Sequence, residues 1–199
     1  MGYNFAVMRL DPETLLDAYA QGAFPMADED GRIRWYSANP RGVLPLERFH
    51  IPQTLRQTLR QSKFEIRINY DFEAAMRACM KARIERTWIN EELIAAYVRL
   101  HKLGHAHSVE AWRDGELTGG LYGVSLGGAF FGESMFHSQR DASKVALVAL
   151  VERLKERGFE LLDTQTCSDH LKRFGGIEID EAEYLRRLHQ AIDRECHFA

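Results

Sequence analysis

The spacing of apolar residues along the 199-residue chain predicts a mixture of helices and strands. Helices are expected where apolar positions recur every three to four residues, and strands where they alternate or form short runs between turns. The predicted helices span 11–23, 53–61, 71–82, 91–103, 141–157 and 181–194. The predicted strands are a short one near 33–36, followed by 64–69, 107–113, 116–124, 127–136 and 159–165.

Several ends of these elements carry local signals. Asp11 is placed to cap the first helix, with Pro12 at its first helical position. Asn90 is placed to cap the helix over 91–103, and Gly104 is placed to end it. Asp114-Gly115 is a strong hairpin signal between two strands. Consecutive strands followed by a crossover helix and one more strand predict an α+β fold with a mixed sheet.

This order of elements resembles the GNAT superfold of acyl-CoA-dependent N-acetyltransferases, a mixed β-sheet with flanking helices. In that fold, a glycine-containing turn before the crossover helix binds the pyrophosphate of coenzyme A. The turn at the same place here reads HSQRDASKVAL and contains no glycine. We therefore expect an acyl donor other than coenzyme A.

The first part of the chain differs in pattern from the rest. Residues 22–45 are rich in Gly, Pro, Asp and Asn, and they show too little apolar periodicity for a large core of their own. We predict a small N-terminal lobe over 1–48 and a GNAT-like catalytic domain over 49–199.

Composition restricts the class of protein and its expected location in the cell. A hydrophobic content of 45% and a charged content of 28% are typical of soluble globular proteins. No apolar run is long enough to span a bilayer, and the opening MGYNFAVMRLDPE lacks the layout of a signal peptide. The three scattered cysteines form no CxxC pair, so neither a disulfide framework nor a zinc ribbon is indicated. We expect a cytoplasmic protein.

Charge is unevenly distributed along the chain. The formal net charge is −3, yet the stretch from Arg48 to Arg67 contains a single acid, Glu65. The basic residues of this stretch are Arg48, Arg56, Arg60, Lys63 and Arg67. Such a strip either binds phosphates locally or is a solvated helix face.

Five strings together carry a resemblance to a known family. In chain order they are YAQGAFPMADEDGRIRWYSANPR, TWINEEL, HKLGHAHSVEAW, GESMF and LLDTQTCSDH. At these spacings they resemble the leucyl/phenylalanyl-tRNA–protein transferase family, from Leu15 to about Ile192. The resemblance implies transfer of Leu or Phe, and less readily Met, from tRNA to proteins that begin with Arg or Lys. Such additions mark proteins for degradation by the N-end rule. No metal, no organic cofactor and no membrane partner is implied.

Three polar residues are the candidate catalytic groups. Asp163 and Gln165 lie two apart on a predicted strand, so their side chains share a face, which the resemblance places in the active site. Gln165 would accept a hydrogen bond from the attacking amine, and Asp163 would orient that amine or help remove its proton. Glu133 lies among apolar residues, where a carboxylate needs a partner. It would bind the donor's amino group or the acceptor's cationic residue, or form a structural ion pair.

Four other residues are candidates for substrate binding. Met135 and Phe136 are apolar residues beside Glu133, and strand alternation allows only one of them to face a pocket for the Leu or Phe side chain. Trp35 and Trp88 are candidate platforms for the terminal adenine of the tRNA, because aromatic rings stack on bases. Packing in the protein core is the alternative for each of these residues.

The basic strip gains a specific interpretation from the resemblance. Arg56 and Arg60 lie one helical turn apart, with Lys63 nearby, and we expect them to contact phosphates of the tRNA acceptor stem. Two other function classes stay open at this point. One is an N-acetyltransferase that uses acetyl-CoA, and the other is an RNA-binding module without catalysis.

Overall fold

The computed structural model describes residues 10–83 and 87–199, which form a seven-stranded mixed sheet and a separate two-stranded hairpin. The order in the large sheet is β4-β5-β6-β7-β8-β3-β9, and all neighbours are antiparallel except β7 and β8. The α+β class with a GNAT-like mixed sheet is thereby confirmed. The strands are β1 Phe24–Ala27, β2 Ile33–Tyr36, β3 Arg41–Val43, β4 Glu65–Ile68, β5 Ala106–Arg113, β6 Glu116–Leu126, β7 Ala129–His137, β8 Leu161–Gln165 and β9 Ile177–Ile179.

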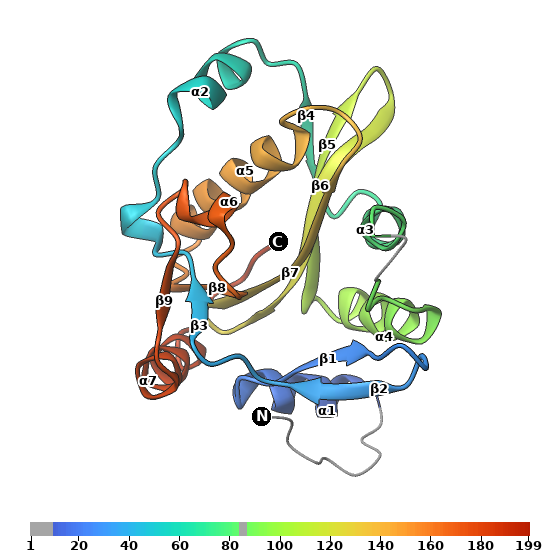
Figure 1. Cartoon of the computed structure of the whole chain (residues 1–199), viewed down its shortest axis with the longest axis vertical. Helices are drawn as coiled ribbons and strands as arrows, with labels where there is room; N and C mark the ends of the chain where they lie inside the picture. The colour runs from blue at the N-terminus through green and yellow to red at the C-terminus, as the bar shows by residue number, and fades with distance from the viewer. Residues whose placement is uncertain (1–9, 84–86) are drawn as a thin grey trace.

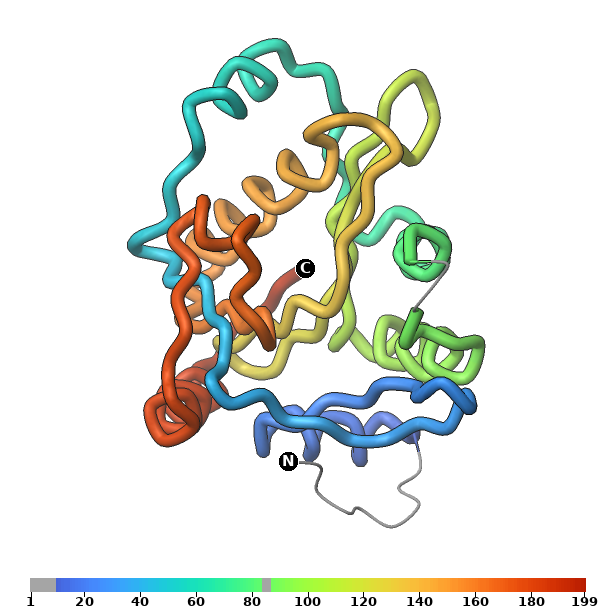
Figure 2. Tube along the Cα trace, in the orientation of Figure 1, coloured from blue at the N-terminus to red at the C-terminus, as the bar shows by residue number. Residues whose placement is uncertain are grey.

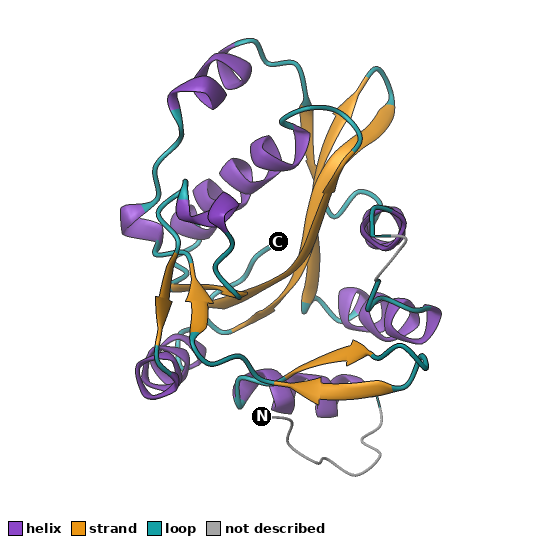
Figure 3. Ribbon diagram, in the orientation of Figure 1, coloured by secondary structure: helices purple, strands orange, loops and turns teal. Residues whose placement is uncertain are grey.

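Helices cover both faces of the large sheet. Figure 1 and Figure 3 show α5 and α2 on one face and α3 and α4 on the other. The helices are α1 Pro12–Ala20, α2 Gln53–Arg60, α3 Phe72–Lys81, α4 Glu91–Lys102, α5 Ala142–Glu156, α6 Asp169–Lys172 and α7 Glu181–Ile192, with a 3-10 turn η1 at Leu46–Arg48. Each face has its own apolar core, one beneath α5 and the other around α1, α3, α4 and α7.

The predicted elements are all present, with ends that differ by three residues or fewer. The expected caps are formed, since Asp11 accepts a hydrogen bond from the Thr14 amide at 3.0 Å and Asn90 accepts one from the Leu93 amide at 2.9 Å. The turn at Asp114-Gly115 has a positive φ at both residues, as a type I′ hairpin requires. Five short elements, β1, β3, η1, α6 and β9, were not predicted.

The N-terminal segment contributes to two parts of the molecule. Its first part, α1 with the β1–β2 hairpin, lies beneath the large sheet (Figure 1). Its last part, β3, lies between β8 and β9, although these strands are more than a hundred residues away in sequence (Figure 2). Only glycine fits at position 42, because a Cβ atom there would lie 2.3 Å from the Thr166 carbonyl carbon. The domain boundary at residue 48 stays a prediction, and residues 1–9 lie outside the described residues.

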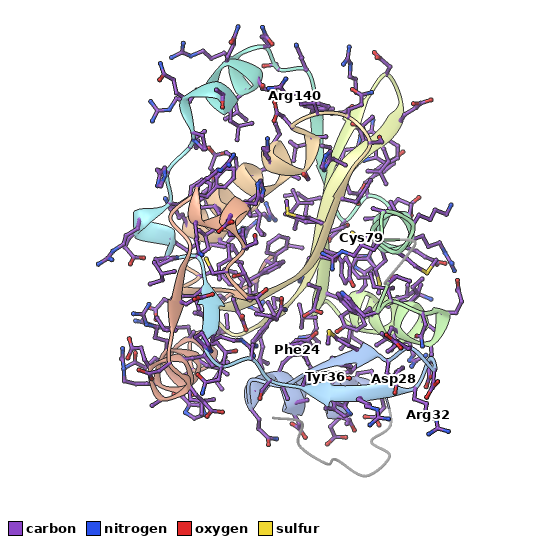
Figure 4. All side chains as sticks on the ribbon, in the orientation of Figure 1. Phe24, Asp28, Arg32, Tyr36, Cys79 and Arg140 are labelled. Atoms are coloured by element: carbon purple, nitrogen blue, oxygen red, sulfur yellow. The ribbon has the colours of Figure 1, made fainter. Side chains whose placement is uncertain are left out.

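The cysteines occupy unremarkable positions. Cys79, on α3, and Cys167 are buried, Cys196 is half-buried, and all three are free thiols (Figure 4). Burial raises the pKa of the Cys79 thiol to about 12, so this group stays protonated at neutral pH. Within residues 10–83 and 87–199, no helix combines the length and the apolar character needed to cross a membrane.

Candidate active site

A cleft lies where β7 and β8 separate. The two strands pair only over Ala129–Phe131 and Leu161–Asp163. Beyond that point β7 remains paired with β6, while β8 remains paired with β3. The resulting opening has a volume of about 450 Å³ and is lined by residues from both strands, from the β1–β2 hairpin and from α5 and α6.

A β-bulge aims Glu133 into this opening. Tyr122 of β6 is paired with Ser134 and Gly123 with Gly132, so Glu133 is the extra residue on β7. Bulges bend a strand and redirect a side chain, which is the usual reason for finding them near functional sites. Glu133 is only 7% exposed, yet its side chain lines the cleft.

The Glu133 carboxyl group is held by three neighbours rather than by an arginine. Its Oε1 accepts hydrogen bonds from the Tyr19 hydroxyl at 2.8 Å and from Gln165 Nε2 at 3.1 Å, and the Tyr19 hydroxyl is also hydrogen-bonded to that of Tyr97. Burial is the main cause that raises the pKa of Glu133 to about 8. The same burial, with the charge of Glu133, raises the pKa of both tyrosines well above the usual value. Burial therefore favours the protonated form of Glu133 at neutral pH.

Gln165 stands at the end of β8 in a tight turn. Its φ is 55°, and the Thr166 amide donates to the Thr164 carbonyl at 2.6 Å, which is the hydrogen bond of a γ-turn. A non-glycine residue in this conformation is strained and persists only where its surroundings hold it. Asp163 provides that hold, because its Oδ1 accepts the Gln165 amide hydrogen at 2.8 Å.

Asp163 is completely buried in a closed network. Arg41 donates to its carboxylate from Nη2 at 2.6 Å and from Nε at 3.0 Å, and the Tyr184 hydroxyl donates at 2.7 Å. Arg41 Nη1 also donates to the Gly22 carbonyl at 2.8 Å, so the same guanidinium ties β8 to the N-terminal segment. Asp163 is not among the residues that line the cleft. Both of its oxygens are occupied by protein donors.

One half of the cleft is apolar. Met135 lines it, whereas Phe136 is 6% exposed and packs into the core on the other face of the sheet, so the structure separates the two as strand alternation predicts. The apolar side chains that line this half are Leu121, Met135, Leu147, Leu150, Leu162 and Leu171.

The two tryptophans lie in different surroundings. Trp88 is half-buried and lines the cleft, together with Met26 of β1. Trp35 is 5% exposed, is paired with Pro25 in the hairpin and belongs to the apolar core, so it does not reach the cleft. The buried Tyr122 hydroxyl also lines the cleft, and it has no hydrogen-bond partner among the described residues.

The three basic residues expected to contact tRNA are on or near α2. Arg56, Arg60 and Lys63 are exposed, and none forms an ion pair within the described parts of the chain. None of them lines the cleft. The basic strip is therefore a separate surface and not a wall of the cleft.

Four functional neighbours were missed in the sequence analysis. Arg41 and Tyr184 hold Asp163, while Tyr19 and Tyr97 surround Glu133. Tyr19 and Tyr97 occupy apolar positions of helices, where they are indistinguishable from core residues. The buried Arg41 follows a proline in an irregular segment, and only the need of a buried aspartate for a cation hints at it.

The fold and the site define a class of α+β proteins in which a mixed sheet opens into a cleft between two separating strands, with a polar pair beside an apolar pocket. Comparison with known proteins narrows this class. The family described as leucyl/phenylalanyl-tRNA protein transferase matches residues 43–189, and its N-terminal domain matches residues 8–39. The chain belongs to this family and is an aminoacyltransferase.

Relatives with the family's name cover nearly the whole chain. A leucyl/phenylalanyl-tRNA–protein transferase of Rubrobacter xylanophilus is 55% identical over 96% of this chain and 100% of its own. One from Paramagnetospirillum magneticum is 54% identical over 95% of this chain and 92% of its own. Among solved structures, L-PGS from Bacillus licheniformis matches with a TM-score of 0.45 and 13% identity, over 77% of this chain and 50% of that one.

Removing the cation of the buried pair should destabilise the protein strongly. Arg41→Met leaves the Asp163 carboxylate buried without a counter-ion, which costs about 3–5 kcal/mol of unfolding free energy. Arg34→Met is the matched control, because it breaks the exposed pair with Asp28 and should lower the free energy of unfolding far less. Equilibrium unfolding in urea measures both. Equal losses for the two variants would contradict a structural role for Arg41.

The raised pKa of Glu133 predicts a specific dependence of stability on pH. The folded state favours the protonated carboxyl group, whereas the unfolded chain ionises near its ordinary pKa of about 4.3. This preference makes its full contribution to the free energy of unfolding below pH ~4. The contribution is lost as pH rises towards the folded-state pKa of about 8. Glu133→Gln lacks the titrating group. Between pH 5 and 8.5, the wild type should therefore lose a few kcal/mol relative to this variant. Urea unfolding measures both proteins. If the difference between their free energies of unfolding is constant across that range, Glu133 does not titrate as described.

Proposed function

We propose that this protein transfers leucine or phenylalanine, and less readily methionine, from tRNA to proteins that begin with Arg or Lys. The transfer takes place in the cytoplasm, where charged tRNA is available, and it marks the acceptors for degradation by the N-end rule. The observation that carries the proposal is the cleft, which joins an apolar pocket to the Gln165–Glu133 pair. The acceptor class follows from the family resemblance.

The reaction is aminolysis of an ester. The α-amine of the acceptor protein attacks the carbonyl carbon that joins the amino acid to the ribose of the terminal adenosine. A carbon–nitrogen bond forms, the ester carbon–oxygen bond breaks, and the ribose hydroxyl leaves with a proton. Since the ester is already activated, alignment of the two substrates and stabilisation of the developing oxyanion are the main tasks of the protein.

The apolar half of the cleft suits the donor's side chain. Met135 and the five leucines give the cleft a largely apolar lining, which favours Leu, Phe and Met over polar amino acids. Trp88 and Met26 lie at the other side of the cleft, and they are our candidates for contact with the adenine. We assign Trp35 to the support of the hairpin that presents Met26, because it is buried in the core.

Glu133 and Gln165 are placed to handle the attacking amine. An α-ammonium group has an ordinary pKa of about 7.7–8.0, close to the raised pKa of about 8 for Glu133. A proton passes easily between groups of matched pKa, so Glu133 suits the role of general base. Gln165 uses Nε2 towards Glu133, which leaves its Oε1 to accept a hydrogen bond from the amine.

Asp163 acts through Gln165 and not on the amine. Its oxygens are occupied by Arg41, Tyr184 and the Gln165 amide, and it is fully buried. These contacts favour an indirect role through Gln165 over direct orientation of the amine or removal of its proton. Asp163 holds the strained turn that places Gln165 beside Glu133.

A transfer assay tests the proposed function directly. The purified protein should move labelled leucine from charged tRNA to a peptide that begins with Arg. Ribonuclease added beforehand should abolish the transfer, because the adenosine ester is the acyl donor, and acetyl-CoA should not replace it. Acetylation of the peptide from acetyl-CoA without leucine transfer would favour an N-acetyltransferase instead. Binding of tRNA with neither activity would favour an RNA-binding module.

Gln165→Ala should separate catalysis from binding. The loss of one preorganised polar group commonly lowers kcat by about 10²–10³. The affinity for tRNA should change much less, because the basic strip is remote from Gln165. Gln190→Ala removes a glutamine side chain from the exposed face of α7 and is the matched control. Near-normal kcat for a folded Gln165→Ala protein would remove Gln165 from the mechanism.

A further inference from the structure

The basic helix α2 and the cleft are connected by the turn between β7 and α5. The Thr58 hydroxyl on α2 donates to the Asp141 carboxylate at 3.3 Å, and Lys144 Nζ donates to the other oxygen of Asp141 at 2.6 Å. Arg140, in the same turn, has a side chain that is 91% exposed and lies at the end of the molecule that α2 occupies (Figure 4). This turn is therefore tied on one side to α2 and on the other to the first turn of α5, a helix that lines the cleft.

Four basic or titratable side chains belong to elements next to this turn or at the cleft. His137 ends β7, Lys144 is in the first turn of α5, and His170 and Arg173 are on and just after α6. We call these four residues the rim cluster. His170 lines the cleft and packs edge-on against Phe174, with 5.2 Å between ring centroids. Burial lowers the pKa of His170, and the charges of Lys144, Arg173 and His137 lower it further.

The positive charge of the rim cluster is only partly neutralised. Lys144 is paired with Asp141, and the nearby Asp169 is paired with Lys172 at 3.3 Å. Arg173 is exposed and has no ion-pair partner among residues 10–83 and 87–199. An uncompensated guanidinium two residues from Leu171, which lines the cleft, is suited to an anionic ligand. Arg and Lys are the side chains that most often bind phosphate.

We propose that the rim cluster binds the phosphates of the unpaired 3′-terminal nucleotides of the donor tRNA. The proposal rests on the proposed function and adds the route by which the single-stranded end of the tRNA reaches the cleft. If α2 holds the duplex and the cleft holds the terminal adenosine, the phosphodiesters between them must cross the β7–α5 turn and the rim cluster. Each of these phosphates carries one negative charge, and a basic groove that follows the backbone is how proteins hold single strands.

Three leucyl donors of decreasing length isolate this contact: charged tRNA, the leucyl ester of the trinucleotide CCA, and leucyl-adenosine, which has no phosphate. In the double variant Lys144→Gln with Arg173→Gln, the ratio of kcat/KM on leucyl-CCA to kcat/KM on leucyl-adenosine should fall about tenfold, since hydrogen bonds between charged groups are involved. The salt dependence on leucyl-CCA should also flatten, by roughly 0.7 in log–log slope for each lost phosphate contact.

Matched variants complete the test. Lys172→Gln, next to Arg173 but paired with Asp169, should keep the wild-type ratio, and Lys144→Arg with Arg173→Lys should restore most of it. Arg56→Gln with Arg60→Gln should lower transfer from tRNA relative to leucyl-CCA, because a trinucleotide has no acceptor stem. A wild-type ratio in the Lys144→Gln, Arg173→Gln variant would overturn the rim-cluster proposal alone. Absence of transfer from all three donors by the wild type would instead overturn the proposed function.

Discussion

The buried ion pair between Arg41 and Asp163 is the interaction on which the arrangement of the cleft depends. Arg41 is 1% exposed and Asp163 is not exposed at all, so both charges have lost their hydration and need each other. The guanidinium also binds the Gly22 carbonyl and lies over the ring of Tyr184 at 4.4 Å. One side chain thus joins the N-terminal segment, β8 and α7. The N-terminal segment and β8 both line the cleft, so its geometry depends on the way these parts are held.

Two local departures from regular sheet structure shape the polar part of the cleft. The bulge on β7 turns Glu133 inwards, and the γ-turn at the end of β8 brings Gln165 to meet it. Neither arrangement is favourable on its own, because a buried carboxyl group and a residue with a positive φ both raise the free energy of the folded chain. The tyrosine hydroxyls around Glu133 and the carboxylate of Asp163 offset these costs. The site is thus held by residues that do not themselves face the substrate.

The sequence was informative where signals are local. Caps such as Asn90, the Asp114-Gly115 turn and the long apolar repeat of α5 predicted their elements closely. Strands of three or four residues, such as β3 and β9, are too short for any period to show, and they form because the sheet offers them partners. The candidate site was found through the motifs that contain Glu133 and Gln165. The hydrogen bonds between Arg41 and Asp163 were not predicted. They join residues 122 apart in sequence, and no local pattern indicates such a pair.

The position of β3 also bears on how the protein is made. This strand is synthesised early, at residues 41–43, yet its partners β8 and β9 lie at 161–165 and 177–179. On the ribosome, β3 therefore remains without its partner strands until most of the chain has been synthesised. Contacts so distant in sequence form slowly, and unpaired strand edges invite association with other chains. The antiparallel strands β4 to β7 are contiguous in the sheet and nearly so in the chain, so they can assemble first. The cleft is then the last part of the fold to be completed, and a truncated chain lacking β8 has no means of forming it.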